Sequence, residues 1–258
     1  MTDETFKHIE NVRVDMSECD FHGRWKPANI FRTLSEAAGN HADELDSGFK
    51  EMEAHGYYWV LSRMKVKFLS YPKGKDVVTV QTWPRMIGQK LFYIREFQIF
   101  DEQQNPLVLA TSAWLVIDTK SRRLVPPRSV PNLPMATTPW AYALDEQLEK
   151  IVLPEGGVQR YSQKAAYSAI DQMGHVNNSR YVEAICDCFD YAVFDQYEID
   201  WLQINYDKEV RPNDELVVNM IESPEEENLF GFRGLNLTSQ TKAFESIVKM
   251  RQAISPRT

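Results

Sequence analysis

Residues 171–193 read DQMGHVNNSRYVEAICDCFDYAV, a polar loop that runs directly into a helix pattern. The helix is indicated by apolar residues at helical spacing, namely Tyr181, Val182, Ile185, Cys188, Phe189, Ala192 and Val193. The two asparagines and the serine of the loop are good helix N-cap residues, and the glycine suits a bend. Capping therefore explains much of the loop, but it leaves Asp171 and His175 as candidates for chemistry.

The same order of elements occurs earlier in the chain. Residues 20–45 read DFHGRWKPANIFRTLSEAAGNHADEL, which also begins with an aspartate, a glycine three residues later, and then a helix pattern. Strand-like runs follow each helix, with turn residues between them: 57–69, 76–83, 90–100, 107–118, and then 200–210, 215–223, 229–237, 244–254. Each half of the chain is therefore predicted to be one long helix followed by a meander of strands.

When one long helix is followed by a meander of strands, the strands are expected to form a curved antiparallel sheet that wraps the apolar face of the helix. This is an α+β arrangement. This matches the hotdog fold, and two copies in one chain predict a tandem double hotdog. Prolines 126, 127, 131, 134 and 139 lie between the copies, where neither a helix interior nor a central strand would accept them. We expect an N-terminal hotdog over 1–125, a linker over 126–155 and a C-terminal hotdog over 156–258.

The composition excludes several classes of protein. The 258 residues are 43% hydrophobic and 26% charged, which is ordinary for a globular chain. A net charge of -8 argues against nucleic acid as a partner, and no run of apolar residues is long enough for a membrane span. Three cysteines and an acidic start without a signal pattern favour the cytoplasm. The remaining histidines show no ligand-like pairing, so neither a metal nor another cofactor is expected.

A small basic cluster stands out in this acidic chain. Lys120, Arg122, Arg123 and Arg128 lie close together, and no acid occurs between Asp118 and Asp145. A solvated turn explains such a cluster, and so does a docking surface for an acidic partner.

The chain resembles the acyl-acyl carrier protein (acyl-ACP) thioesterases of plants and bacteria. These proteins carry an Asp-x-Asn-x-His-Val-Asn-Asn motif and a Tyr-x-x-Glu segment some 35 residues later, which correspond to DQMGHVNN and to YDKE at 206–209. WVLSRM at 59–64, QTW at 81–83 and ATSAWLVIDTKSRRL at 110–124 also look like the family. The resemblance covers nearly the whole chain and implies two fused hotdogs.

The resemblance implies a catalytic site in the second half. Asp171 and His175 take the positions of the family's catalytic aspartate and histidine, and Glu209 takes that of its catalytic glutamate. Met173 stands where the family usually has an asparagine, whose hydrogen-bonding role would then be lost or would pass to Asn177 or Asn178. Plant members often have a cysteine where this chain has valine, next to the glutamate, so a cysteine nucleophile is not expected.

Thioester hydrolysis needs a nucleophile, a proton acceptor and donors for the developing oxyanion. No Gly-x-Ser-x-Gly elbow occurs in the chain, so a serine mechanism is not supported. The helix start supplies oxyanion candidates, the amides of Val176 and Asn177, with Asn178 beside them as support. Glu209, from the neighbouring strand, is expected to activate water, with His175 hydrogen-bonded to the carboxylates, while Asp171 orients the groups or attacks directly.

In the family, the first half supplies a tunnel for the acyl chain. Leu34, Trp59, Met64 and Trp114 are candidates for its lining, although each is also explained as plain core. The implied function is hydrolysis of fatty acyl-ACP to release free fatty acid in fatty acid biosynthesis. The implied partner is acyl carrier protein with its phosphopantetheine-linked chain, and the enzyme is expected to be a monomer or homodimer. A hotdog acyl-CoA thioesterase and a non-catalytic acyl-binding module are the alternatives.

Overall fold

The structure is a computed structural model that describes residues 7–89, 91–126, 129–130, 133, 142–145, 148–223 and 226–253, and only the backbone of 86–89. The chain divides into two compact units, unit 1 at Met1–Leu148 and unit 2 at Glu149–Thr258. Arg128 of the basic cluster lies outside the described residues.

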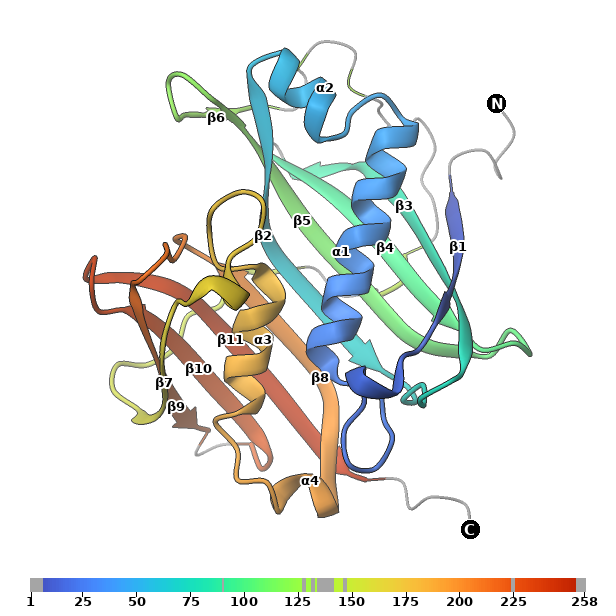
Figure 1. Ribbon diagram of the computed structural model, residues 1–258, viewed down its shortest axis with the longest axis vertical. Helices are drawn as coiled ribbons and strands as arrows, with labels where there is room; N and C mark the ends of the chain where they lie inside the picture. Colours follow the sequence, from blue (N-terminus) through green and yellow to red (C-terminus); the bar gives the residue numbers. More distant parts are fainter. Residues whose placement is uncertain are drawn as a thin grey trace. The chain divides into compact units, whose positions relative to one another are not determined.

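The described residues of unit 1 form a curved sheet with the helices α1 and α2 (Figure 1). Its elements are β1 (His8–Arg13), the 3-10 turn η2 (Met16–Glu18), α1 (Pro27–Glu44), α2 (Phe49–Ala54), β2 (Tyr57–Phe68), β3 (Val77–Gln89), β4 (Phe92–Phe100), β5 (Pro106–Asp118) and β6 (Leu124–Val125). The strand order is β1-β3-β4-β5-β2, antiparallel throughout, with β6 paired to β5.

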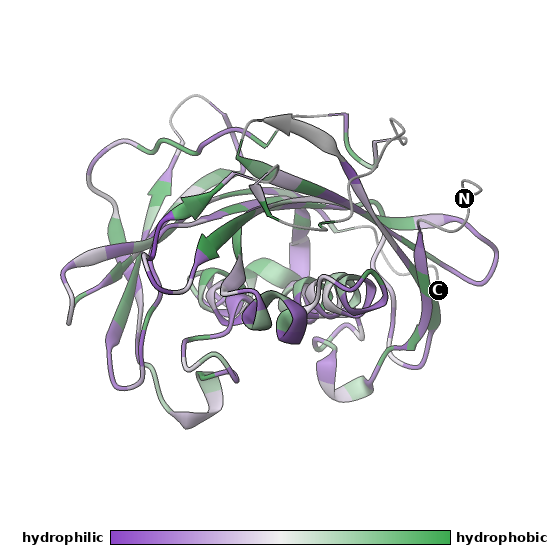
Figure 2. Ribbon diagram, turned by 90° about the horizontal axis from the view of Figure 1, so that it is seen from above, coloured by the Kyte–Doolittle hydropathy of each residue, from purple (hydrophilic) through white to green (hydrophobic). Residues whose placement is uncertain are grey.

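Helix α1 packs its apolar stripe against this sheet. Proline occupies the first turn, where its missing N–H costs nothing. The buried residues of the helix recur every three or four positions: Ala28, Ile30, Phe31, Thr33, Leu34, Ala37, Ala38 and His41. Figure 2 shows hydrophilic and hydrophobic residues mixed along the same elements, as expected where one side of a helix or strand is buried.

Unit 2 repeats the order of elements that unit 1 shows from β1 to β5. It contains β7 (Val158–Lys164), η4 (Tyr167–Ala169), α3 (Asn178–Cys186), α4 (Val193–Gln196), β8 (Tyr197–Tyr206), β9 (Glu215–Glu222), β10 (Leu229–Asn236) and β11 (Thr241–Gln252). The strand order β7-β9-β10-β11-β8 matches that of unit 1. The α+β tandem double hotdog predicted from the sequence is confirmed.

Two details differ from the sequence-based expectation. Helix α3 ends at Cys186, so Cys188, Phe189 and Ala192 of its predicted stripe lie in turns and bends, and Val193 begins α4. Phe189 still packs edge-on against Phe230 and Phe232. Strands β1 and β7 precede the helices and were not predicted. Six of the seven residues of β7 are exposed, so this edge strand lacks the apolar alternation that marks a strand in a sequence.

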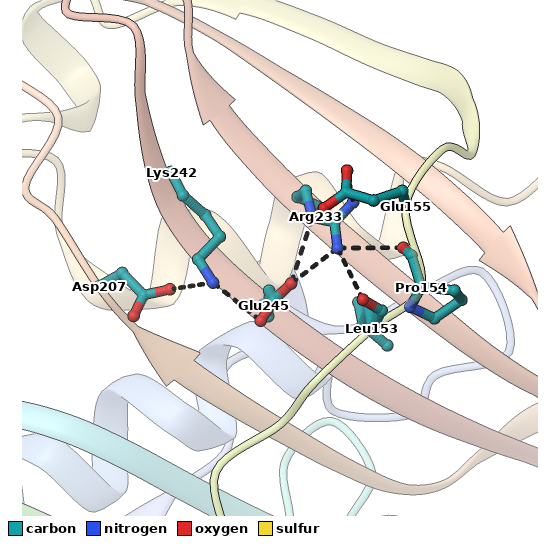
Figure 3. Close-up of polar contacts among 7 residues, drawn as sticks. All are labelled: Leu153, Pro154, Glu155, Asp207, Arg233, Lys242 and Glu245. Carbon is teal, nitrogen blue, oxygen red and sulfur yellow. Dashed lines mark hydrogen bonds and ion pairs between the residues drawn. The ribbon is translucent and has the colours of Figure 1, made fainter.

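The described parts of the proline-rich connection are held on the sheets by side chains. In unit 1, Arg63 Nη1 donates to the carbonyl of Leu148 at 2.6 Å, and the N–H of Ala143 donates to buried Glu96. In unit 2, Arg233 donates to the carbonyls of Leu153 and Pro154, both at 3.1 Å (Figure 3). The domain limits at 125 and 156 stay a prediction.

Candidate active site

The loop with the candidate acid and histidine lies between η4 and α3. The N–H of Asp171 donates to the carbonyl of His175 at 2.9 Å, and the N–H of Gly174 donates back to the carbonyl of Asp171 at 3.0 Å. Gly174 has a φ of 78°, in the left-handed region where glycine is favoured. The loop is therefore a tight turn that brings His175 back beside Asp171, just before the helix.

A second loop, residues 207–214, follows β8 and meets this turn. The N–H of Val176 donates to the carbonyl of Val210 at 2.9 Å. Glu209 lies in this second loop, since β8 ends at Tyr206, so the prediction that it comes from a strand is wrong by a few residues. We call the turn 170–178 together with the loop 207–214 the unit 2 corner.

The unit 2 corner brings His175 and Glu209 into contact. His175 Nε2 lies 2.8 Å from Glu209 Oε2, and both side chains are about one-third exposed, at 32% and 34%. With the carboxylate as acceptor, the imidazole donates from Nε2, which leaves Nδ1 to face other groups. Two of the three predicted catalytic side chains are thus paired while remaining accessible.

Arg211 holds the other oxygen of Glu209 and was not foreseen from the sequence. Its Nη2 lies 2.8 Å from Glu209 Oε1. The hydrogen bond and the charge of Glu209 raise the pKa of this guanidinium above its ordinary value. The arginine side chain is 65% exposed, so water screens the pair. The sequence feature that could have indicated this contact is a cationic residue two positions after the candidate acid.

Asp171 has a different hydrogen-bonding role from Glu209. Its Oδ1 accepts the N–H of Met173 at 2.9 Å, which closes the turn. Among the described residues, His175 makes its side-chain contact with Glu209 and not with Asp171. The expectation of an imidazole bonded to both carboxylates is therefore corrected to one carboxylate.

The backbone donors also differ from the expectation. The N–H of Val176 is taken by Val210, and the N–H of Asn177 donates to the carbonyl of Ala169 at 2.9 Å, so neither is free for an oxyanion. In the part of the chain that the structure describes, the N–H of Asn178 has no acceptor. Asn178 is the first residue of α3, where such an unpaired amide is expected. The candidate oxyanion donor moves from Val176 and Asn177 to Asn178.

The side chains of the two asparagines differ as well. Asn177 Oδ1 caps α3 by accepting the N–H of Ser179 at 3.0 Å and its hydroxyl at 2.8 Å. Asn177 is therefore occupied and does not take over the role of the asparagine that Met173 replaces. The side chain of Met173 is 41% exposed. Within the described residues, the Asn178 side chain has no hydrogen bond and is the one available for that role.

The four candidate acyl-chain contacts lie in unit 1: Leu34 belongs to α1, and the other three lie on the face of the sheet that α1 covers. Trp59 and Met64 of β2 pair with Val116 and Ser112 of β5, and Trp114 lies between these two partners on the same face. Leu34 and Met64 are 0% and 1% exposed. The indole nitrogens of Trp59 and Trp114 donate within the unit, to Ser47 and Ser112, so their rings present apolar faces.

Other reactive groups do not gather near the corner. Within the described residues, no group of three or more His, Cys, Asp and Glu side chains could hold a metal ion. Burial raises the pKa of the Cys188 thiol to about 12 and that of Cys186 further, so both stay protonated and are poor nucleophiles. No described helix is long and apolar enough to cross a membrane.

Two family models match the chain. The acyl-ACP thioesterase N-terminal domain matches residues 5–129, and the acyl-ACP thioesterase C-terminal domain matches residues 156–250. An oleoyl-acyl carrier protein thioesterase of Coriandrum sativum is 25% identical over 87% of this chain and 64% of its own length. A palmitoyl-acyl carrier protein thioesterase of Gossypium hirsutum is 28% identical over 70% of this chain and 46% of its own length. The chain thus spans less than two thirds of these relatives.

Solved structures resemble the whole chain. The crystal structure of an acyl-ACP thioesterase from Bacteroides thetaiotaomicron has a TM-score of 0.82 and 26% identity, and the match covers 97% of this chain and 100% of that one. The 12:0-ACP thioesterase from Umbellularia californica has a TM-score of 0.81 at 20% identity, over 96% and 98% of the two chains, and shows the shared fold.

Proposed function

The chain belongs to the acyl-ACP thioesterase family, and from this premise we propose that it hydrolyses the thioester of fatty acyl-ACP and releases free fatty acid. The observation that carries the proposal is the 2.8 Å contact of His175 with Glu209, in a corner where the N–H of Asn178 has no acceptor among the described residues. A base, a proton carrier and an oxyanion donor then stand at one corner. The reaction belongs to fatty acid biosynthesis.

Glu209 takes a proton from a water molecule as the water oxygen attacks the thioester carbon. The carbon–oxygen π electrons move onto the carbonyl oxygen, and the N–H of Asn178 donates to the resulting oxyanion. Arg211 and His175 each occupy one oxygen of Glu209, and each oxygen keeps a further lone pair for the water proton. Asp171 shapes the turn through its bond to the Met173 N–H and so orients the histidine.

Collapse of the tetrahedral intermediate re-forms the carbonyl and breaks the carbon–sulfur bond. The phosphopantetheine sulfur leaves with the bonding electrons and takes up the proton that the His175 and Glu209 pair collected from water. The products are a free fatty acid and the carrier thiol. Because the imidazole and the carboxylate already share a hydrogen bond, this proton moves over a short path.

Unit 1 is the proposed binding unit for the acyl chain. Leu34, Trp59, Met64 and Trp114 stand on the α1 side of its sheet, and a pocket wall of such residues discriminates a methylene by about 1–3 kcal/mol. In this proposal residues 1–125 bind the chain, 126–155 connect, and 156–258 carry the chemistry.

The proposed partner is acyl carrier protein, which is acidic. The turn between β5 and β6 exposes Lys120, Arg122 and Arg123, a surface that would steer an acidic partner. Arg122 also lies over the Tyr58 ring, 5.4 Å from its centroid, which orders part of the turn. The chain has a net charge of -8, so this exposed basic cluster is a local exception to its overall negative charge.

A turnover panel tests the proposal. Purified protein is given ACP and coenzyme A thioesters of matched acyl chains, from short to long, and free thiol is measured. We expect turnover of ACP thioesters above that of the CoA esters, and loss of turnover in Glu209→Ala. Preferred turnover of CoA esters would reassign the substrate, and acyl-thioester binding without turnover would indicate a binding module.

A further inference from the structure

Tyr181 contacts the backbone that carries Glu209. It lies on α3 and is 3% exposed, and its hydroxyl accepts the N–H of Val210 at 3.3 Å. The carbonyl of Val210 accepts the N–H of Val176 at 2.9 Å. Val210 is thus held from both sides, by the helix through Tyr181 and by the residue after His175.

The phenol is well suited to a fixed position. Its ring lies 5.3 Å from that of Phe244 and 6.0 Å from that of Tyr206, so its packing leaves little freedom. Burial raises the pKa of Tyr181 far above its ordinary value, and the charges of Asp171, Glu209 and Asp214 act in the same direction. The hydroxyl therefore stays neutral, as a stable acceptor for the Val210 amide.

Unit 1 shows that the fold itself does not need this hydrogen bond. The N–H of Trp25 donates to the carbonyl of Pro72 at 2.7 Å, in the same place as the bond from Val176 to Val210. Pro72 has no N–H, and the fourth residue of α1, at the position of Tyr181 in α3, is the fully buried Ile30. Unit 1 folds with neither the hydroxyl nor the amide.

We propose that Tyr181 is a positioning residue for Glu209, an inference that rests on the proposed function. Its hydroxyl fixes the peptide after Glu209 and so sets the carboxylate against His175. A shift of about 1 Å in a reacting group is enough to cost about 100-fold in rate. The hydrogen bond is present in the unit with the acid and histidine pair and absent from the unit without it.

A double-mutant cycle tests the proposal with Tyr181→Phe, Glu209→Gln and the double variant. Tyr181→Phe keeps the ring, and we expect kcat to fall about 10- to 100-fold while KM changes less than about twofold. In the Glu209→Gln background the same change should have little further effect, because the group it positions is gone. Tyr197→Phe, at the start of β8, is the matched control and should retain native turnover.

The imidazole signals of His175 in nuclear magnetic resonance give a second readout in the same variants. Tyr181→Phe should shift them if the contact with Glu209 loosens, whereas lost stability alone would move only the unfolding midpoint. A native kcat in Tyr181→Phe, or an equal fall in both backgrounds, overturns the inference while the proposed function stands. Native turnover in Glu209→Gln overturns the proposed site instead.

Discussion

In unit 1 the N–H of Lys26 donates to the carbonyl of Glu18 at 3.0 Å, and in unit 2 the N–H of Asn177 donates to the carbonyl of Ala169 at 2.9 Å. The glycines of the two turns, Gly23 and Gly174, have φ values of 75° and 78°. We call the turn 19–27 together with the loop 69–76 the unit 1 corner. The backbones of the two corners follow the same path, so the difference between them lies in their side chains.

In the unit 1 corner, the positions of the unit 2 histidine and glutamate are taken by residues that make structural contacts. Arg24 stands at the position of His175, and its Nε donates to Asp20 at 2.7 Å. Its guanidinium also lies 5.9 Å from the centroid of the Tyr71 ring, and Tyr71 stands where unit 2 has Glu209. An arginine stays charged and cannot carry a proton as an imidazole can, and a tyrosine stands in place of the acid, so the unit 1 corner lacks counterparts of both the proton carrier and the base that we propose for unit 2.

The helix starts differ in the same sense. The first residue of α1 is Pro27, which has no N–H, whereas the first residue of α3 is Asn178, whose N–H is unpaired within the described residues. Proline at this position suits helix stability. The same backbone arrangement therefore starts a helix in both units, but the first residue favours helix stability in unit 1 and supplies a backbone N–H donor in unit 2.

The largest effect is expected from removal of the imidazole. His175→Ala should lower kcat on acyl-ACP by about 100- to 10,000-fold, because the proton carrier is lost. Arg24→Ala at the matching place in unit 1 is the control and should keep turnover near native per folded molecule. Equal losses in the two variants would remove the distinction between the corners.

Asn178→Pro turns the start of α3 into that of α1. Proline fits the first turn of a helix, and Asn177 already has the extended backbone that a residue before proline requires, with φ -59° and ψ 140°. We expect a folded protein whose kcat falls about 100- to 1,000-fold, since one oxyanion donor is lost. Asn178→Ala keeps the N–H and should lose much less. Steady-state turnover of both variants decides the role of this amide, and a fully active proline variant would exclude it.

A buried histidine in unit 1 should make the stability, rather than the chemistry, sensitive to acid. His41 on α1 is 2% exposed, and its Nδ1 lies 2.8 Å from Nη1 of Arg95. Burial, and then the charge of Arg95, lower the pKa of His41 to about 3. An unfolded histidine binds a proton below about pH 6.5, so stability is full above that pH and falls as the pH drops toward 3, by about 1.4 kcal/mol per unit.

His41→Gln should flatten this slope in urea unfolding measured between neutral pH and the acid limb. His55→Gln, an exposed histidine at the end of α2, serves as control. An unchanged slope in His41→Gln would show that other groups set the acid sensitivity.

The smallest effect is expected at Met173, the position where the family usually has asparagine. Met173 is 41% exposed, and its backbone N–H donates to the side chain of Asp171. Met173→Asn should therefore change kcat by less than about threefold, because hydrogen bonds at exposed positions contribute little net energy. A gain of tenfold or more would show that this chain lacks a group that its chemistry needs.

Much of the fold was readable because apolar periodicity marks buried elements. The helix that became α1 and the eight strands from β2 to β5 and β8 to β11 follow from it. Strands β1 and β7 do not, because edge strands bury little and their pairing is set by the neighbouring strand. Helix α3 ends before the last four residues of its apolar stripe, of which Phe189 packs from a bend and Val193 begins α4.

The site was readable only in part. The resemblance placed His175 and Glu209 in one group, and the structure pairs them. The amides of Val176 and Asn177 looked available because a sequence does not show which carbonyls a loop will meet, here those of Val210 and Ala169. Tyr181 looked like core, since a phenol in an apolar stripe is distinguished only by the partner of its hydroxyl.

Single-turnover hydrolysis of acyl-ACP, with enzyme in excess, tests most directly whether the chemistry belongs to the unit 2 corner. Glu209→Gln and Tyr71→Phe alter matching positions of the two units, and binding of acyl-ACP is measured in both. The account predicts a hydrolysis rate at least about 100-fold below native for Glu209→Gln, a native rate for Tyr71→Phe, and retained binding in each. Native hydrolysis by Glu209→Gln would contradict it.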